Sequence, residues 1–307
     1  MPLFGGRQRP SQEEQEAAEV DLTRIRDGGI PLGAEQRLRR IGESEAPLFT
    51  SDLSSKEYAL AQASGLQPVA QVMGSSVVKH GYQNYGWGSY SAGAIAELTA
   101  FSDPWNLSRG RAFARLGQEA ELAGADAVIG IELAINNVTD SRSDVEYVVF
   151  GTAVRETTLA GRPRSGPRLC ALNGQDVDKL RRIGAEIRGL LGHTTVVCVT
   201  LSWQASQSMR MWSGNMELTE ITQGVYEARR LVMGEIHRQA RDVGANDVVI
   251  STLTHEIEHA EYERQGMGTQ HVFIVTMHVL GTAIRLGAHE PHPAPLHGPT
   301  LSIDLRG

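Results

Sequence analysis

The stretch GADAVIGIEL, residues 124–133, decides the fold because it occurs twice in the chain. It returns 120 residues later as GANDVVISTL, residues 244–253. In each case a glycine follows a long apolar-striped segment and precedes a run of β-prone residues. Glycine adopts the positive φ that closes the last turn of a helix, so the pattern predicts a helix ending directly before a strand.

Two further blocks repeat in the same order. ELT at residues 97–99 returns as ELT at 217–219, again 120 residues later. FGTAVR at 150–155 returns as LGTAIR at 280–285, which is 130 residues later. The second copy therefore carries ten extra residues between its last two matched blocks. Self-similarity at a fixed spacing indicates a duplicated structural unit.

Each copy predicts the same order of elements. A short leading helix begins near Asp52 or Asp176, and a strand follows over residues 68–76 or 194–202. The long helix of the second copy carries an apolar stripe at steps of three and four. Its members are Ile221, Val225, Ala228, Val232, Ile236, Ala240 and Val243. A hairpin of two strands completes the unit, formed by residues 129–135 and 145–154 in the first copy.

The sequence thus predicts the α+β class, with two tandem β-α-β-β domains that each pack a small antiparallel sheet on one long helix. One helix covers only one face of such a sheet, so the other face and the free edges need a partner. The second copy and other chains are both candidates. Self-association is therefore a physical expectation.

The expected organisation is an N-terminal mobile or helical extension (1–45), domain 1 (46–158), a linker (159–168), a diverged domain 2 (169–287) and a tail (288–307). The extension includes a helical patch at residues 35–41. The linker is rich in Arg, Pro and Gly, a composition typical of a solvated connection.

Composition narrows the function classes. The 307 residues carry a net charge of −7, which disfavours sequence-independent nucleic-acid binding. Two cysteines are too few for a disulfide framework. No apolar run approaches the roughly 20 residues of a membrane span, and no apolar signal core follows the N-terminus. We therefore expect a cytoplasmic protein with neither a membrane nor a nucleic acid as partner.

The repeated blocks resemble the YbjQ-like family, which carries a provisional label of heavy-metal binding. The matching residues are GADAVIG (124–130) and GTAV (151–154), together with FTSDL (49–53) and VMGSS (72–76). Both copies together cover roughly residues 46–287. The resemblance implies a fold similar to dodecin subunits, assembly into closed rings, typically pentamers, and no established catalytic residues.

HEIEH at residues 255–259 has the letters of the zinc-protease motif. That motif works on a helix, where its two histidines share a face, whereas the repeat places these residues in or near a hairpin. His255 and His259 also share a face of a strand, where they are candidate ligands of a non-catalytic metal site, with His271 and His278 as further ligands. A polar, solvent-facing hairpin is the competing interpretation.

Aromatic and sulfur-containing side chains form two further candidate groups for ligand or interface contacts. Tyr82, Tyr85, Trp87 and Tyr90 alternate with glycines, an arrangement suited to interfaces or to stacking a flat ligand. The second group comprises Trp203, Met209, Met211 and Trp212, with Met216 and Cys198 nearby. Methionine fills irregular gaps at interfaces, and its thioether also suits soft ions.

The sequence favours a non-enzymatic, homo-oligomeric binding or scaffold protein, with metal or small-ligand binding at domain or subunit interfaces. The cofactor stays unknown, with a divalent or soft metal ion as the candidate. A metal-dependent, hydrolase-like enzyme using the His255 region is the alternative.

Overall fold

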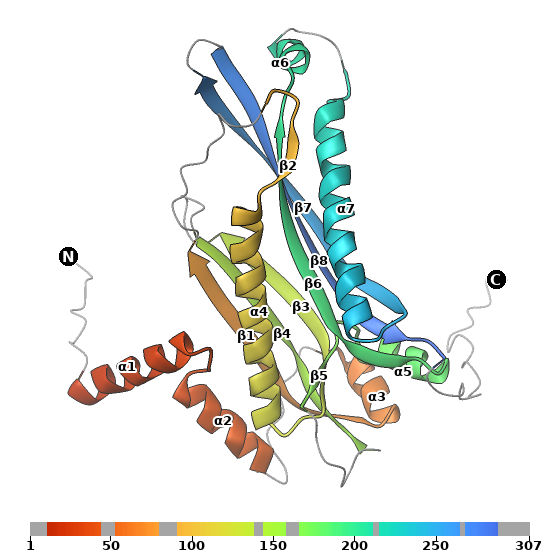
Figure 1. Ribbon diagram of the computed structural model, residues 1–307. Helices are drawn as coiled ribbons and strands as arrows, with labels where there is room; N and C mark the ends of the chain where they lie inside the picture. Colours follow the sequence, from red (N-terminus) through yellow and green to blue (C-terminus); the bar gives the residue numbers. More distant parts are fainter. Residues whose placement is uncertain are drawn as a thin grey trace, which may run out of the picture.

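The computed structural model describes residues 11–43, 53–79, 91–137, 144–157, 166–210, 215–264 and 268–287. The described part of the chain forms helices and two four-stranded sheets, so the predicted α+β class is confirmed. Figure 1 shows the two long helices running along the sheets. The helices are α1 (Gln12–Arg26), α2 (Leu32–Glu43), α3 (Ser55–Ala63), α4 (Thr99–Leu122), α5 (Gly174–Arg182), α6 (Trp203–Arg210) and α7 (Thr219–Asp242).

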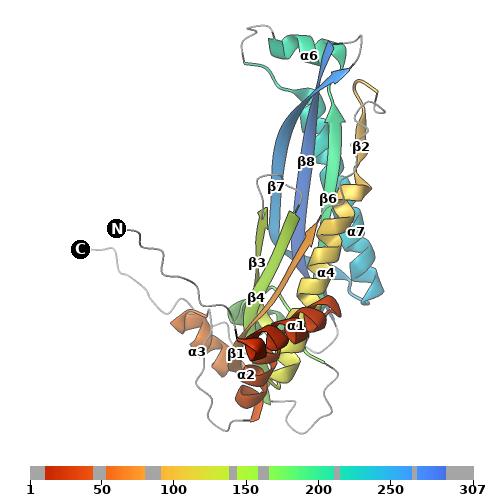
Figure 2. The same cartoon turned by 90° about the vertical axis from the view of Figure 1, so that its left-hand side faces the viewer.

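Sheet A has the strand order β1-β4-β3-β5, and sheet B has the order β2-β6-β8-β7. The strands of sheet A are β1 (Leu66–Lys79), β3 (Ala127–Asn137), β4 (Asp144–Glu156) and β5 (Arg168–Leu169). Those of sheet B are β2 (Ile95–Glu97), β6 (Glu186–Thr200), β7 (Asp247–Arg264) and β8 (Gly268–Arg285). Figure 2 shows that the β7–β8 hairpin extends well beyond sheet A.

The two halves of the chain share local details as well as element order. Gly124 and Gly244 end the long helices with φ values of 67° and 69°. The second residue after each glycine accepts an equivalent hydrogen bond. The carboxylate of Asp126 accepts from the Glu156 N–H at 2.9 Å, and the amide oxygen of Asn246 accepts from the Leu286 N–H at 2.8 Å. The repeated sequence blocks therefore form the same helix-to-strand junction twice.

The first strand of the second half differs from the prediction. It begins at Glu186, eight residues before the predicted start at residue 194. Polar Glu186 and Arg188 interrupt the apolar pattern there, and the register shifts between Ile187 and Gly189. A β-bulge breaks the two-residue alternation from which a strand is recognised in sequence.

Short strands and N-terminal helices add to the predicted scheme. Arg168, which we expected in the linker, begins β5, and β5 pairs in parallel with β3. In the N-terminal extension, Leu38 of α2 is fully buried beside α4. Arg115 of α4 donates hydrogen bonds to the carbonyls of Gly29 and Ile25, at 3.1 and 2.8 Å. The second helix of the extension is thus packed into the core.

Helix α4 contacts both sheets. It packs along β1 and β4 of sheet A, and its N-terminal half packs on β6 of sheet B. One apolar cluster accordingly combines Val72 of β1, Leu116 of α4 and Val196 of β6. Helix α7 covers the opposite face of sheet B, over Val197, Val275 and their neighbours. The first half therefore supplies part of the cover for the sheet of the second half.

Gly74 sets the distance between α4 and β1. A Cβ at this position would lie 1.9 Å from the carbonyl oxygen of Ala112, far inside van der Waals contact. Because that oxygen belongs to the helix backbone, only a shift of α4 would make room. We expect Gly74→Ala to lower the free energy of unfolding by about 2 kcal/mol or more, measured by urea denaturation.

The matched control is Gly117→Ala in α4, where a Cβ meets nothing within 4 Å. Alanine is a better helix former than glycine, so this variant should be neutral or more stable by up to about 1 kcal/mol. Equal stability of Gly74→Ala and the wild type would show that the contact does not limit the packing of α4.

Candidate functional site

The outer edge of β6 is where the two halves of the chain join. Strand β2, from the first half, pairs antiparallel with this edge, with Ile95 opposite Val199 and Glu97 opposite Val197. Just before β2, the Gly93 N–H donates to the Thr200 carbonyl at 2.9 Å. An exposed strand edge offers unpaired backbone groups to any other chain. Here the first half satisfies those groups.

Side chains of α4 continue this pairing where β2 ends. The amide of Asn106 both donates to the Thr194 carbonyl at 2.9 Å and accepts from the Thr194 N–H at 3.0 Å. Ser102 Oγ accepts from the Val196 N–H at 3.0 Å, and the Leu98 N–H donates to the Val196 carbonyl at 2.8 Å. A primary amide has the same donor and acceptor as a peptide group, so Asn106 acts as one residue of an added strand.

His278 of β8 lies behind this joint, buried against α4. Its Nδ1 is 2.9 Å from Thr194 Oγ1, and its ring meets that of Trp105 edge to face at 4.9 Å. Burial, and to a smaller extent the Arg109 guanidinium, lowers the pKa of His278 to about 4. The same two causes, in the same order, lower the pKa of the neighbouring His193 to about 4. Both imidazoles are therefore neutral at pH 7.

The second half contains the same docking element, and none of the described strands pairs with it. Glu217 and Leu218 correspond to Glu97 and Leu98, and the backbone at Leu218 has nearly the geometry of Leu98. Thr222 Oγ1 donates to Glu217 at 3.0 Å, as Ser102 does to Glu97 at 3.3 Å.

The exposure of the two docking elements differs. Residues 94–97 are half-buried against β6, whereas residues 215–217 are exposed. Tyr226, at the position equivalent to Asn106, is 67% exposed. We call Asn215–Tyr226 the second docking element.

Strand β1 presents the matching edge, because it is the terminal strand of sheet A. The Met73 N–H donates to Glu119 of α4 at 2.8 Å, just as the Gly192 N–H of β6 donates to Gln239 of α7 at 3.3 Å. The odd-numbered residues of β1 therefore direct their backbone groups away from β4. Val77 has this orientation, and its side chain is 53% exposed. We call Met73–Lys79 the β1 edge.

The predicted metal ligands do not all lie together. His255 and His259 lie four residues apart on β7 and share one face, opposite Met277 and Phe273 of β8. His278 is opposite Thr254 and therefore points to the other face of the sheet. The predicted grouping of His278 with the other two is not formed, because side chains of even and odd positions alternate across a strand.

The zinc-protease arrangement is also not formed. On an extended strand, His255 and His259 are separated by about 13 Å along the chain, at roughly 3.3 Å per residue. Two ligands of one zinc ion lie only about 3.3 Å apart, given metal–nitrogen bonds of roughly 2.0–2.1 Å. Glu256, the would-be general base, points to the opposite face. The hydrolase-like alternative therefore lacks its geometric basis.

His259 instead approaches His271, which the sequence suggested only as a further ligand. His259 Nε2 lies 3.0 Å from His271 Nδ1, and Glu261 Oε1 lies 3.5 Å from the same nitrogen. Ligand atoms of these three residues all lie within 4.8 Å of one another. We call them the hairpin cluster.

The aromatic and sulfur-containing candidates are described only in part. Tyr82, Tyr85, Trp87, Tyr90, Met211 and Trp212 lie outside the described residues. Met209 lies in α6, with no description of its side chain. Trp203 begins α6 and is 69% exposed, and Met216 is 52% exposed. Met216 is thus an accessible apolar side chain within the second docking element, and Trp203 is one on α6, which lines a pocket together with that element.

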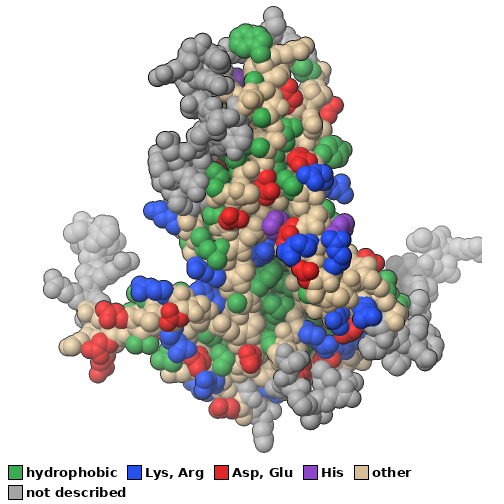
Figure 3. Space-filling view, viewed as in Figure 1, with side chains coloured by type: hydrophobic (Ala, Val, Ile, Leu, Met, Phe, Trp, Pro, Cys, Tyr) green, Lys and Arg blue, Asp and Glu red, His purple; other side chains and the backbone are tan. Residues whose placement is uncertain are grey.

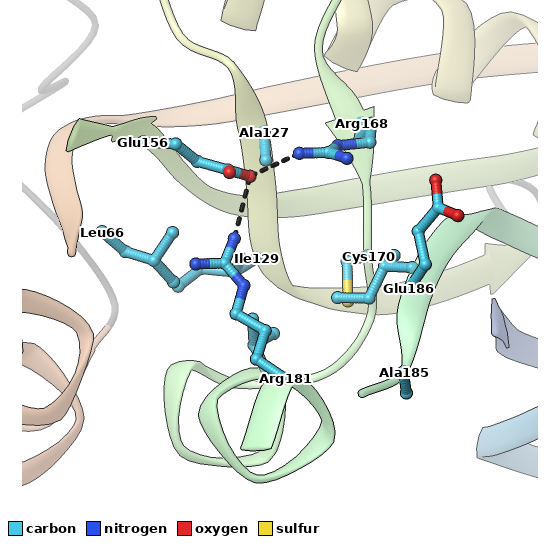
Figure 4. Close-up of a pocket in the computed structure, with 11 residues that line it drawn as sticks. Leu66, Ala127, Ile129, Glu156, Arg168, Cys170, Arg181, Ala185 and Glu186 are labelled. Atoms are coloured by element: carbon cyan, nitrogen blue, oxygen red, sulfur yellow. Dashed lines mark hydrogen bonds and ion pairs between the residues drawn. The ribbon is translucent and has the colours of Figure 1, made fainter. Parts of the chain in front are cut away.

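A cavity of about 310 Å³ lies where β4, β5 and α5 meet (Figure 4). Leu66, Ile129 and Cys170 contribute to its largely apolar wall. The nearly buried carboxylate of Glu156 accepts from Arg168 at 2.6 Å and from Arg181 at 2.9 Å. These ion pairs connect the end of β4 to β5 and α5. We therefore interpret Glu156 and its two arginines as a structural contact between the two halves.

Both cysteines are buried. Burial raises the pKa of the Cys170 thiol and of the Cys198 thiol, each to about 11. Both thiols are therefore protonated at neutral pH in the metal-free protein. The soft-ion role of Cys198 stays a prediction.

Sequence reasoning missed the most informative residues of the joint, Ser102 and Asn106. The 120-residue repeat maps the apolar stripe of α7 onto α4. That stripe identifies the α4 residues that face sheet A, but not those that contact the edge of β6. Asn106 stands where the second half has Tyr226, and this polar-for-aromatic difference was the available signal. Glu261 could have been found from the two-residue alternation that links it with His259.

The low pKa of His278 predicts a pH dependence of stability. An unfolded histidine has a pKa near 6.5, so between pH 6.5 and 4 the unfolded chain binds more protons than the folded chain. The contribution of His278 is thus complete above pH 6.5 and is lost as the pH falls toward 4. We expect His278→Asn to remove about 2 kcal/mol of the stability difference between pH 7 and pH 4.5.

The measurement is urea denaturation at both pH values and at one protein concentration. Asparagine retains a hydrogen-bonding group for Thr194, which limits other damage. The control is His237→Asn, because His237 is exposed on α7 and should leave the pH dependence unchanged. The same slope in His278→Asn and the wild type would contradict the assignment.

The surface and helices give two further observations. Acidic and basic side chains are interspersed over the face in Figure 3. Helix α7 carries the ion pairs Arg230–Glu227 and Arg238–Glu235. Within the described residues, no helix has the length and apolar character needed to cross a membrane.

Comparison with known proteins gives matches at two scales. A family model described as "Putative heavy-metal-binding" (YbjQ_1) matches residues 70–157. The encapsulin nanocompartment protein Rv1762c of Mycobacterium tuberculosis is 32% identical over 220 residues, which cover 70% of this chain and 80% of that protein. UPF0145 proteins of Natronomonas pharaonis and Alkaliphilus metalliredigens are each 42% identical over 59 residues, or 19% of this chain and 55% of each relative. With its β-α-β-β pattern and these matches, the chain belongs to the YbjQ-like family.

Proposed function

We propose that this chain is a non-enzymatic protein that assembles head to tail with copies of itself and binds small ligands or metal ions within that assembly. The observation that carries the proposal is the exposed second docking element. Its counterpart in the first half is occupied by a strand of the same chain. The chain thus contains both one example of the joint and the parts for another.

The internal joint gives the geometry of the proposed contact. In it, β2 and the start of α4 lie along the outer edge of β6. Shifting this arrangement by one repeat places residues 215–218 and the start of α7 along the β1 edge of a second chain. Leu218 then donates to the Val77 carbonyl as Leu98 does to Val196. No new type of interaction is required.

The exposed side chains of the two surfaces fit this contact. Met73 and Val77 of β1 are 50% and 53% exposed, and Val148 of β4 lies half-buried beside them. The second docking element contributes Met216 and Tyr226, which are 52% and 67% exposed. Exposed apolar side chains that gather at the centre of a surface are typical of protein interfaces.

This contact joins different surfaces of two identical chains. Such a heterologous contact leaves both surfaces available again at the ends of each dimer, so it propagates until the rotation closes a ring. The ring assembly that the resemblance to the family implies is one outcome of this rule. We infer that the two halves are tandem copies. We also infer that the internal joint was once a contact between two separate chains and became intramolecular when the copies were fused.

The absence of an enzymatic role is supported by where the perturbed groups lie. Among the described residues, those with strongly raised or lowered pKa include His193, His278, Cys170 and Cys198. All four lie in cores or at the internal joint, and none faces the cavity at Glu156 except Cys170, whose thiol is protonated. The name of the Mycobacterium relative associates that protein with a nanocompartment, which supports a role within a larger assembly.

The test uses two complementary variants. Val77→Lys places a charge on the β1 edge, and Tyr226→Lys places one on the second docking element. Both side chains are exposed, so each variant should fold. We expect the wild type to form oligomers at micromolar concentration and each variant alone to be monomeric, as measured by light scattering after gel filtration.

Mixing the variants is the decisive step. Val77→Lys keeps an intact docking element and Tyr226→Lys keeps an intact edge, so the mixture should form dimers and nothing larger. Ile183→Lys, at an apolar side chain that is 55% exposed at the end of α5, is the control and should assemble like the wild type. A monomeric wild type, or variants that keep its mass, would contradict the proposal.

A further inference from the structure

Three potential metal ligands come together at the far part of the β7–β8 hairpin. His259 and Glu261 are two residues apart on β7 and therefore share one face. The register of the hairpin places His271 opposite Glu261 and Phe273 opposite His259, all on that face. The arrangement is thus a consequence of strand pairing and needs no loop.

The distances fit one small ion. Four ligands at roughly 2.0–2.1 Å around a tetrahedral zinc lie about 3.3 Å from one another. Two of the three distances in the hairpin cluster, 3.0 Å between His259 Nε2 and His271 Nδ1 and 3.5 Å between His271 Nδ1 and Glu261 Oε1, bracket this value. The third pair, His259 and Glu261, lies within 4.8 Å. The Glu261 side chain is exposed, and its rotation would bring the carboxylate to the ion that the two imidazoles approach.

The imidazoles are held in place by their surroundings. The His259 ring stacks between His271 and Phe273, with centroid distances of 5.2 and 4.7 Å. His271 is only 7% exposed, and its Nε2 is buried with no hydrogen-bond partner among the described residues. A rigid, partly buried pair of imidazoles loses little conformational entropy when it binds an ion.

We propose that His259, Glu261 and His271 bind one divalent transition-metal ion, of which Zn²⁺ is the reference. Imidazole and carboxylate ligands suit Zn²⁺, Ni²⁺ and Cu²⁺ better than they suit thiophilic ions. Three protein ligands leave a fourth position for water or for a group from another molecule. The site does not depend on the proposed self-assembly, because all three ligands come from one hairpin.

The site belongs to the second half alone. Strand β3 of the first half ends at Asn137, which corresponds to Ile257, so the three ligands lie in the part of the hairpin that contains the ten extra residues. The matched family model covers residues 70–157, which do not include this hairpin. The metal site is therefore a property of this chain's insertion and is separate from the family label.

The test is a titration of untagged full-length protein with Zn²⁺ in competition with a chromophoric chelator. We expect one tight equivalent per chain in the wild type. His259→Asn and Glu261→Gln, both at exposed positions, should weaken that equivalent at least tenfold while leaving the circular dichroism spectrum unchanged. His271→Asn should do the same, but its residue is buried, so the two exposed variants are the primary evidence.

His255→Gln is the matched control, because His255 is an exposed histidine on the same face of the same strand, four residues away. It should bind Zn²⁺ like the wild type, and so should Val77→Lys, in which self-assembly is blocked. The proposal is overturned if His259→Asn and Glu261→Gln keep wild-type affinity. It is equally overturned if only His255→Gln loses binding, or if binding disappears in Val77→Lys.

Discussion

The open edge of a β-strand is the constraint on which this structure depends. A backbone N–H or carbonyl that loses water must find another partner, and a terminal strand presents a row of them. For β6 the chain solves this with β2, Leu98, Ser102 and Asn106, all supplied by the first half. The position of α4, the burial of His278 and the contact between the sheets all follow from that joint. For the β1 edge, the described side chains satisfy some of these backbone groups, such as the Met73 N–H, but no described strand pairs with it.

Much of the fold is readable in the sequence because its signals are local and repeated. The 120-residue spacing, the glycines at 124 and 244, and the stripe of α7 predict helices and strands at the places where they occur. Strands β2 and β5 are three and two residues long, too short for any periodic pattern. They exist because a neighbouring edge is available, and that information is not local. The early start of β6 was not predictable either, because the bulge between Ile187 and Gly189 breaks the alternation of apolar and polar residues.

The histidine motif shows how the same residues change meaning with secondary structure. On a helix, HEIEH would bring two histidines to one ion with a glutamate beside them. On a strand, the same spacing separates the histidines and turns the glutamate to the other face. The alternation of the strand then pairs His259 with Glu261, and the hairpin register adds His271 from twelve residues further along. Only the register, which depends on the length of the hairpin, could reveal that third ligand.

One residue difference between the two halves, Glu119 in the first and Gln239 in the second, concerns the state of a single chain before it associates. Gln239 both accepts from Gly192 and donates to its carbonyl, at 3.3 and 3.1 Å, whereas Glu119 at the equivalent position accepts from the Met73 N–H. A carboxyl group, unlike an amide, has no N–H to offer the Met73 carbonyl. Because Met73 is half exposed, water can serve that carbonyl. A chain is therefore able to fold alone with its β1 edge hydrated, and the proposed association would exchange that water for protein.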